Sequence, residues 1–182
     1  MNRLVKINLS AKNKIGRVVW NIVWGVFGRT SPKLFHPWRS MLLRLFGAKV
    51  GVEVHVYPTA KIWAPWNLEI DDRGCIGESV DCYCVDKIRI GAGSTVSQYS
   101  FLCSASHDFT DVNLPLVAAP ITIGDYVWVT ADVFVAPGVE IKDRAVVLAR
   151  SSVFNDVESG VVVKGNPAKY LRERDLTVKS FR

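Results

Sequence analysis

The sequence of 182 residues lacks any long hydrophobic run. A helix that spans a bilayer needs about 20 consecutive apolar residues. The nearest candidate is RVVWNIVWGVFG, from Arg17 to Gly28, which Asn21 and Gly25 interrupt. It lacks a convincing small-residue cleavage site, so we do not interpret it as a signal peptide. We therefore predict a cytoplasmic protein, and an association with the inner face of the membrane stays open.

Cysteine and histidine are scarce, with four and three residues respectively. Without a secretion signal, the cysteines are expected to be reduced, buried thiols rather than disulfides. A single residue separates Cys82 from Cys84, and the sequence has no second cysteine pair or nearby histidine to accompany them. A zinc site uses a longer spacer and four ligands, so no metal is predicted. The other cysteines are Cys75 and Cys103.

The chain carries a formal net charge of +6, from 23 Lys and Arg against 17 Asp and Glu. A positive excess favours anionic partners, but no nucleic-acid motif accompanies these residues along the chain. A phosphorylated cofactor or an acidic sugar explains the charge as well as RNA would. We therefore predict no nucleic-acid partner, and a solvated basic surface stays an equal alternative to any specific use.

What the sequence does contain is a six-residue period, which matches neither a helix nor a simple alternating strand. In the last block the aliphatic residues are Ile123, Val129, Val135, Ile141, Val147 and Val153. The same spacing occurs upstream, with insertions between the blocks, at Ile90, Val96 and Leu102, at Ile70, Ile76 and Cys82, and at Val50, Val56 and Ile62. Three units close one coil of a triangular prism. Residues 50–158 are therefore predicted to form a parallel β-helix whose apolar layers bury one another.

Each unit is predicted to turn a corner after its inward aliphatic residue. Glycine follows that residue directly at Gly51, Gly77, Gly91 and Gly124. We expect these glycines to adopt φ values that other residues avoid. Four positions after the aliphatic residue, smaller residues are expected to fill the corner, as at Ser94, Ser100 and Ser106.

The register breaks between two well-formed coils, in the loop DFTDVNLPLVAAP of residues 108–120. Loops expelled from a regular scaffold tend to carry function. His107 is the last residue of the coil before this loop, so we predict that it lies over a crevice and acts in catalysis. His36 and His55 are expected to be surface or packing residues.

Several segments together resemble the hexapeptide-repeat acetyltransferases of the galactoside, maltose and nodulation-factor type. They are CSASHDFT, APITIGDYVWVTADVFVAPGVEI, ARSSV and VVVKGNPAKYLRER, and LLRLFGAKVG at residues 42–51 is shared with the colanic acid biosynthesis subgroup. The resemblance covers roughly residues 37–174. It implies a mainly β, left-handed parallel β-helix and a homotrimer with active sites between subunits. The implied activity is acetyl-CoA-dependent O-acetyl transfer to a sugar hydroxyl in bacterial exopolysaccharide biosynthesis.

The chemistry of acetyl transfer fits these residues. An acetyl thioester is already activated, so its transfer to a hydroxyl needs a base, a place for the oxyanion and good alignment, and no metal. His107 is expected to take the hydroxyl proton as general base. The family implies direct transfer. Cys103 and Ser106 lie near enough that a covalent step stays an alternative.

The roles of the cofactor-binding residues come from the resemblance. It places the backbone amides of Ala131 and Ala149 against the thioester carbonyl and the pantetheine arm of acetyl-CoA. Pro167, in the GNPAK motif, is assigned to the same site. Nearby cations are expected to meet the phosphates of coenzyme A, and these are Arg150, Lys164, Lys169 and Arg172.

The resemblance assigns the binding of the acceptor to Asp81 and Trp128. Asp86 is an alternative to Asp81 for the same role. Relatives often have Asn where this chain has Asp81. An ionised carboxylate only accepts hydrogen bonds, whereas Asn also donates, so the pose of the acceptor is expected to differ. Trp128 has a second interpretation, as a packing residue at a corner of the prism.

The two ends of the chain fall outside the hexad pattern. Residues 1–49 predict two short helices. We favour a cap on the open end of the prism, or packing within the trimer, over interfacial membrane attachment through tryptophans beside basic residues. Residues 159–182 are predicted to form a tail that contributes to the coenzyme A site.

Two other enzyme classes do not fit the sequence. A γ-type carbonic anhydrase needs three imidazoles on zinc, and His107 has no histidine partner nearby. A nucleotidyltransferase needs a nucleotide-binding α/β domain, for which the roughly 50 residues before the repeat are too few. Acetylation of another small acceptor, such as an antibiotic or an amino acid, stays open. So does a non-catalytic β-solenoid that serves in assembly.

Overall fold

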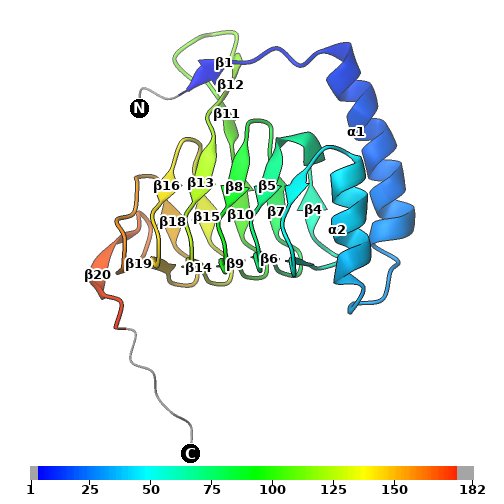
Figure 1. The fold of residues 1–182 in the computed structure, drawn as a ribbon. Coiled ribbons are helices and arrows are strands. Elements are labelled where there is room, and N and C mark those ends of the chain that lie inside the picture. Colours follow the sequence, from blue (N-terminus) through cyan, green and yellow to red (C-terminus); the bar gives the residue numbers. More distant parts are fainter. Residues whose placement is uncertain (1–3, 176–182) are drawn as a thin grey trace, which may run out of the picture.

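A computed structural model describes residues 4–175 as a β-solenoid of about six turns with two helices at its N-terminal end (Figure 1). The solenoid is a left-handed parallel β-helix, as predicted. In each turn the chain passes three flat faces, each a sheet of short strands. The apolar layers between these faces form the core.

The faces are numbered in the order in which the chain visits them. Face 1 contains β2 (Lys49–Val50), β5 (Leu68–Ile70), β8 (Ile88–Ile90), β13 (Ile121–Ile123) and β16 (Glu140–Ile141). Face 2 contains β3 (His55–Val56), β6 (Cys75–Ile76), β9 (Thr95–Val96), β14 (Trp128–Val129), β17 (Val146–Val147), β19 (Val161–Lys164) and β20 (Lys169–Glu173). Face 3 contains β4 (Lys61–Ile62), β7 (Asp81–Tyr83), β10 (Phe101–Cys103), β15 (Phe134–Val135) and β18 (Ser152–Val153).

The predicted hexad positions are confirmed as the inner layers. Ile123, Val129 and Val135 are fully buried, and each pairs in parallel with the residue 18 positions later in the next turn. In the earlier turns the offset is 20 residues, as between Ile70 and Ile90, because each turn contains a two-residue insertion. Stacking apolar residues of similar size at this offset buries continuous columns, which supply the main favourable free energy of a solenoid.

The prediction about the corner glycines is wrong. Gly51, Gly77, Gly91 and Gly124 do not have positive φ. A Cβ at Gly91 would instead come within 3.0 Å of the backbone of Gly124 in the next turn, so close approach between coils requires the glycine. The left-handed conformation occurs two positions after the glycine, for example at Tyr126 with a φ of 56°.

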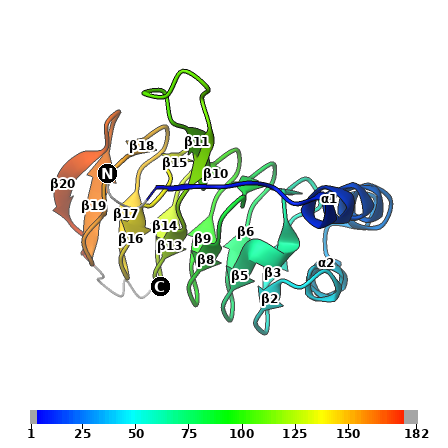
Figure 2. The same cartoon turned by 90° about the horizontal axis from the view of Figure 1, so that it is seen from above.

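The prediction that Ser106 fills a corner of the core is also wrong, because Ser106 is exposed. The chain leaves the solenoid earlier than predicted. β11 (Ala105–His107) pairs antiparallel with β12 (Leu116–Ala118), and both project from the body as a hairpin (Figure 2). His107 is therefore not the last residue of a coil but part of this hairpin. The loop predicted at residues 108–120 is the outer part of the hairpin with its return strand.

The C-terminal part is more regular than the predicted tail. β19 pairs in parallel with β17, so the solenoid continues beyond residue 158. β20 then turns back antiparallel along β19. The last seven residues of the predicted tail, 176–182, lie outside the described residues.

The N-terminal helices lie across the open end of the first turn. α1 (Ala11–Val23) continues into the π-helix η1 (Trp24–Gly28), and α2 (His36–Leu45) follows. The first turn has no strand below it, so its outward carbonyls need other donors. The indole N–H of Trp20 donates to the Ile62 carbonyl at 2.7 Å and that of Trp24 to Ala60 at 2.9 Å, while Arg39 Nε donates to Val56 at 2.6 Å.

The four cysteines are free thiols, but the expectation that all are buried is wrong for Cys75 and Cys103, which are partly exposed. Cys82 and Cys84 are buried, and burial raises the pKa of Cys84 to about 12. Within residues 4–175, no three His, Cys, Asp or Glu side chains are arranged to hold a metal ion. No helix in that range is long and apolar enough to cross a membrane.

Candidate active site

The hairpin that carries His107 is part of a three-stranded sheet. β11 and β12 pair with His107 opposite Leu116. The N-terminal strand β1 (Val5–Lys6) adds antiparallel to the other edge of β12. Just beyond β1, the backbone N–H of Ile7 donates to the Leu116 carbonyl at 3.0 Å. The hairpin is therefore held by a segment about 100 residues away in the sequence.

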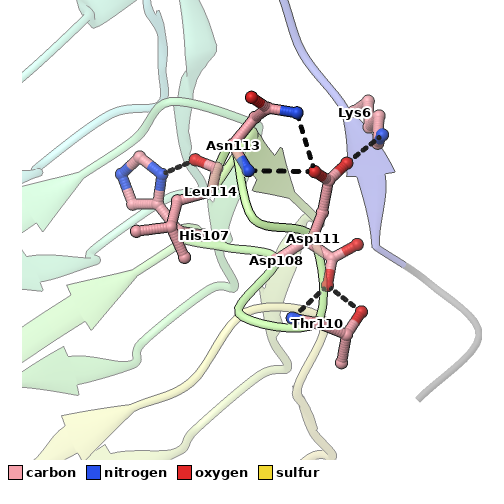
Figure 3. Close-up of polar contacts among 7 residues, drawn as sticks. All are labelled: Lys6, His107, Asp108, Thr110, Asp111, Asn113 and Leu114. Carbon is pink, nitrogen blue, oxygen red and sulfur yellow. Dashed lines mark hydrogen bonds and ion pairs between the residues drawn. The ribbon is translucent and has the colours of Figure 1, made fainter.

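Side chains of the hairpin loop order its backbone (Figure 3). Asp108 Oδ1 accepts hydrogen bonds from the backbone N–H and the hydroxyl of Thr110, at 3.0 and 2.6 Å. Asp111 accepts the backbone N–H of Asn113 at 3.0 Å and pairs with Lys6 of β1 at 3.1 Å. These hydrogen bonds lower the pKa of both carboxyls, so each is ionised at neutral pH and the loop geometry persists.

His107 is oriented by the far side of the same loop. Its Nδ1 lies 2.5 Å from the carbonyl oxygen of Leu114 (Figure 3). A carbonyl can only accept, so Nδ1 carries the proton, and in the neutral imidazole Nε2 has the free lone pair. Leu114 has a φ of 44°, a conformation that aliphatic residues rarely adopt, and this turn directs its carbonyl at the ring. The exposed imidazole is thus arranged to accept a proton at Nε2.

Asp81 lies in a groove of about 350 Å³ between face 3 and the N-terminal helix. Asn21 and Arg29 line the helix side, and Lys61 and Tyr83 line the solenoid side. Burial raises the pKa of the Asp81 carboxyl, while Lys61, 3.8 Å away, opposes that shift. The groove therefore offers one acidic and two basic groups beside aromatic surface, a composition suited to a hydroxyl-rich ligand.

The two other predicted acceptor residues lie elsewhere. Asp86 follows β7, and its backbone N–H donates to the hydroxyl of Ser104, the residue just before β11. Trp128 lies on face 2, and its indole N–H donates to Ser97 at 3.0 Å. Trp128 is half exposed, so the structure does not bury it as a packing residue. Within one chain, Trp128 and Asp81 are on different faces and do not form one pocket.

The predicted amide donors stack at a single edge of the prism. Ala131 precedes β15 and Ala149 precedes β18, so both lie where strands of face 3 begin. The backbone N–H of Arg150 donates to the Ala131 carbonyl at 3.1 Å, which holds the two corners together. Among the described residues, no acceptor is found for the N–H of Ala131 or of Ala149. Pro167 has no N–H and lies beside β18, because Gly165 accepts the backbone N–H of Ser152 at 3.0 Å and Ala168 donates to the Ser152 carbonyl at 2.8 Å.

The predicted cations spread from this edge toward the C-terminal end. Lys164 and Lys169 face each other across the β19–β20 turn. Arg172 is exposed on β20, opposite Val162. Arg150 is exposed at the edge and lies 3.4 Å from Asp132. All four side chains are exposed, but only Arg150, Lys164 and Lys169 lie at this edge, because Arg172 is farther along β20 on face 2.

The structure does not join His107 to these donors within one chain. Strands of face 3 begin at the Ala131 edge and end at the opposite edge, from which the His107 hairpin projects. A three-residue strand spans about 10 Å, so at least that distance separates the two groups. Within one chain, His107 and these backbone amides therefore do not form one site. The other two histidines, His36 and His55, stack on each other at the cap, with ring centroids 4.6 Å apart.

Sequence reasoning did not identify several residues of the site. The supports of the hairpin, Ile7 and Leu114, have no motif, because backbone pairing leaves no side-chain signature. Arg29 and Lys61 come from segments about 30 residues apart and meet only in the folded groove. Lys61 had one usable signal, since it stands directly before a hexad residue and must face outward.

No protein-family model matches the chain. Over 162 residues the chain is 46% identical to the colanic acid biosynthesis acetyltransferase WcaF of Escherichia coli (strain K12), and the alignment covers 89% of each protein. The chain belongs to the hexapeptide-repeat acetyltransferases. This membership confirms the family and the enzyme class predicted from the motifs.

Two solved structures show how far the fold of this acetyltransferase family is shared. The hexapeptide-repeat acetyltransferase VCA0836 of Vibrio cholerae O1 biovar eltor, solved with acetyl-CoA, is 26% identical and aligns with a TM-score of 0.82 over 91% of both chains. A galactoside acetyltransferase solved with coenzyme A aligns with a TM-score of 0.84 over 94% of this chain and 86% of its own, at 24% identity. The second likeness shows the fold alone.

Proposed function

We propose that this acetyltransferase uses acetyl-CoA to acetylate a sugar hydroxyl in bacterial exopolysaccharide biosynthesis, as a homotrimer with active sites between subunits. The observation that carries the proposal is the orientation of His107. Its Nδ1–H is held by the Leu114 carbonyl, and among residues 4–175 no hydrogen bond is found at Nε2, on a hairpin that projects from the scaffold. The likeness to WcaF supports the exopolysaccharide pathway, and the VCA0836 complex supports acetyl-CoA as donor.

In the proposed mechanism His107 is the general base. Nε2 accepts the proton of the acceptor hydroxyl as that oxygen attacks the thioester carbonyl. The Leu114 carbonyl stabilises the imidazolium that forms, because it accepts a hydrogen bond from Nδ1–H in both protonation states. The proton then passes to the departing thiolate of coenzyme A. A positioned base of this kind contributes about 100- to 10,000-fold to the rate.

Direct transfer is favoured over an acyl-enzyme. A nucleophilic cysteine needs a lowered pKa. Burial raises the pKa of the Cys103 thiol, and its Sγ donates to the Ala105 carbonyl at 3.0 Å. Ser106 is exposed, and no hydrogen bond from it to a base is found within residues 4–175. Neither residue is therefore activated for covalent catalysis.

The edge formed by Ala131, Ala149 and Pro167 is the proposed site of acetyl-CoA. The backbone N–H groups of Ala131 and Ala149, for which no acceptor is found among the described residues, can donate to the thioester carbonyl and to the amide carbonyls of the pantetheine arm. Their small side chains let a ligand approach the backbone. Lys164 and Lys169, with Arg150 and Arg172, supply positive charge for the phosphates.

A trimer resolves the separation between this edge and His107, since the hairpin of one subunit then meets the edge of its neighbour. A row of partly exposed aromatic rings on face 3 supports such an assembly. The ring centroids of consecutive members are 5.6 to 6.2 Å apart, and Phe101 and Phe154 are 36% and 52% exposed. Burial of this row between subunits would remove a large apolar surface from water. The other members are Trp63, Tyr83 and Phe134.

The proposed acceptor site is the Asp81 groove together with Asp86 at the root of the hairpin. In the trimer, Trp128 of a neighbouring subunit completes it. The carboxylate of Asp81 accepts hydrogen bonds from sugar hydroxyls, and Tyr83 offers a ring face to the apolar side of a sugar. The cations Arg29 and Lys61 suit an acceptor that carries a phosphate or a uronic acid.

The function is tested by incubating the protein with acetyl-CoA and candidate sugars while free thiol is measured. Sustained release that depends on the acceptor, with an acetylated sugar detected by mass spectrometry, is the expected result. Hydrolysis of acetyl-CoA alone controls for acceptor-independent release. If no glycan precursor or nucleotide-sugar raises release above that control, while an antibiotic or an amino acid does, the acceptor class is wrong.

The N-terminal strand gives a separate prediction about the position of His107. Ile7→Pro removes the N–H that bonds to Leu116, and kcat is expected to fall about tenfold, since displacement of a catalytic group by about 1 Å can cost up to about 100-fold. The KM for acetyl-CoA should not change. Lys6→Ala is the control, because it removes only an exposed ion pair with Asp111. Wild-type kcat in Ile7→Pro would show that β1 does not position the hairpin.

A further inference from the structure

The first helix of the cap is apolar on two opposite sides. One side carries Trp20 and Trp24, which are buried against the solenoid. At 100° per residue, a second stripe lies opposite them and consists of Ile15, Val18, Val19, Ile22 and Val26. Ile15 and Ile22 are 65% and 62% exposed. A globular protein needs only one apolar stripe per surface helix, so the cap alone does not explain the second.

The second helix and the connection before it extend this surface. Leu34 and Leu45 are 82% and 71% exposed, and Phe35 and Met41 are also exposed. Trp38 joins the two helices, because its indole N–H donates to the Phe27 carbonyl at 2.9 Å. Both helices stand side by side at one end of the solenoid, away from the hairpin (Figures 1 and 2). Together these residues form an apolar surface, the cap face, at that end.

The charge of the chain is strongly divided between its parts. No Asp or Glu precedes Glu53, whereas residues 1–52 contain ten of the 23 Lys and Arg. Residues 53–182 contain the remaining 13 basic residues and all 17 acidic ones, so this part of the chain has a formal net charge of −4. Lys12 and Lys14 are exposed and lie on either side of the outer stripe of α1.

We infer that the cap face docks on the surface of an anionic lipid membrane, with α1 and η1 lying in the interface. An apolar stripe flanked by lysines, without acidic residues, is the composition of an interfacial helix. Basic residues near the headgroups gain attraction from anionic lipid. A second copy of the chain fits the face poorly, because it would bring two segments of the same sign together with no acidic residue opposite.

Docking in this way has a consequence for the acceptor groove. Asn21 and Gly25 line that groove and neighbour Val18 and Ile22 on the surface of the helix. The groove therefore opens beside the docked surface, at the level of the lipid headgroups. An acceptor held at the membrane would reach Asp81 without crossing the protein. This consequence rests on the proposed function, whereas the docking itself does not.

The inference is tested by sedimentation with vesicles of phosphatidylcholine, with and without one-third phosphatidylglycerol. The full-length protein should pellet with the anionic vesicles at low salt and not with the neutral ones. At about 1 M salt the screening length is about 3 Å, so binding should weaken strongly. Ile22→Glu should lower the partition coefficient at least about tenfold, because it places a charge in the apolar stripe.

Val112→Glu is the matched control. It makes the same change of charge at an exposed apolar residue on the hairpin loop, outside the cap face. Glutamate is a good helix former, so Ile22→Glu should keep α1 folded, which circular dichroism checks. Wild-type protein that stays in the supernatant with anionic vesicles would overturn the inference. Equal binding by the two variants would also overturn it. Because the assay contains no substrate, its result is independent of whether the proposed acetyl transfer is correct.

Discussion

His107→Ala is expected to lower kcat by at least about 100-fold, the low end of what a positioned general base contributes. The loss should appear in kcat, because the imidazole accepts the proton during the chemical step. The KM for acetyl-CoA should change little, because His107 is not part of the proposed acetyl-CoA site. Steady-state kinetics with acetyl-CoA and the best acceptor measures both constants. His107→Gln should be nearly as slow, since a side-chain amide has no basic lone pair at neutral pH.

His55→Ala is the natural control for this experiment. His55 is exposed too, but it stacks on His36 in the cap, far from the hairpin. Its activity should match the wild type. Sedimentation velocity on His107→Ala should show the same oligomer as the wild type, which separates a chemical defect from an assembly defect. A fully active His107→Ala enzyme would refute the assignment of the base.

The largest effect on stability is expected for Trp20→Ala. Trp20 is fully buried, packs on Trp24 and Phe46 with centroid distances of 5.0 and 5.1 Å, and donates to the Ile62 carbonyl. Loss of a buried tryptophan leaves a cavity and costs about 3–5 kcal/mol. The unpaired carbonyl adds to this loss. Urea denaturation at one fixed protein concentration measures the change in the free energy of unfolding, because an oligomer's stability depends on concentration.

Trp38→Ala provides the comparison. Trp38 also donates its indole N–H to a backbone carbonyl, but its side chain is 38% exposed. Its loss should cost about 1–2 kcal/mol, because less surface returns to water. If Trp20→Ala costs no more than Trp38→Ala, the helices do not stabilise the first turn as the hydrogen bonds suggest.

Much of the fold could be predicted from the sequence because a β-helix repeats one local environment. Every sixth residue faces the same interior, so Ile123 and Val135 report the same layer, and the two-residue insertions leave the pattern intact within each block. Ser106 shows where this reasoning fails. It keeps the spacing of Ser94 and Ser100 and is nevertheless exposed, because pairing with β12 draws the chain out of the solenoid.

The candidate site was predictable only in part. The motif around His107 identified the residue but not its support, since the Leu114 carbonyl and the Ile7 amide are backbone groups that any residue offers. Asp81 was singled out by resemblance, and its groove depends on Arg29 of the helical cap, which the hexad pattern does not describe. Trp128 was assigned to the acceptor with Asp81, and the structure places the two on different faces.

The sequence by itself determined the β-helix, the inward layers, the histidine and the family, because a short apolar period and a set of ordered motifs are local properties. Only the tertiary structure shows at which residue the chain leaves the solenoid and which face of each cap helix is covered. It alone also explains why residue 91 must be glycine. Those outcomes depend on contacts between residues far apart in the chain. The hairpin needs β1, the cap needs the carbonyls of the first turn, and Gly91 lies against Gly124 of the next.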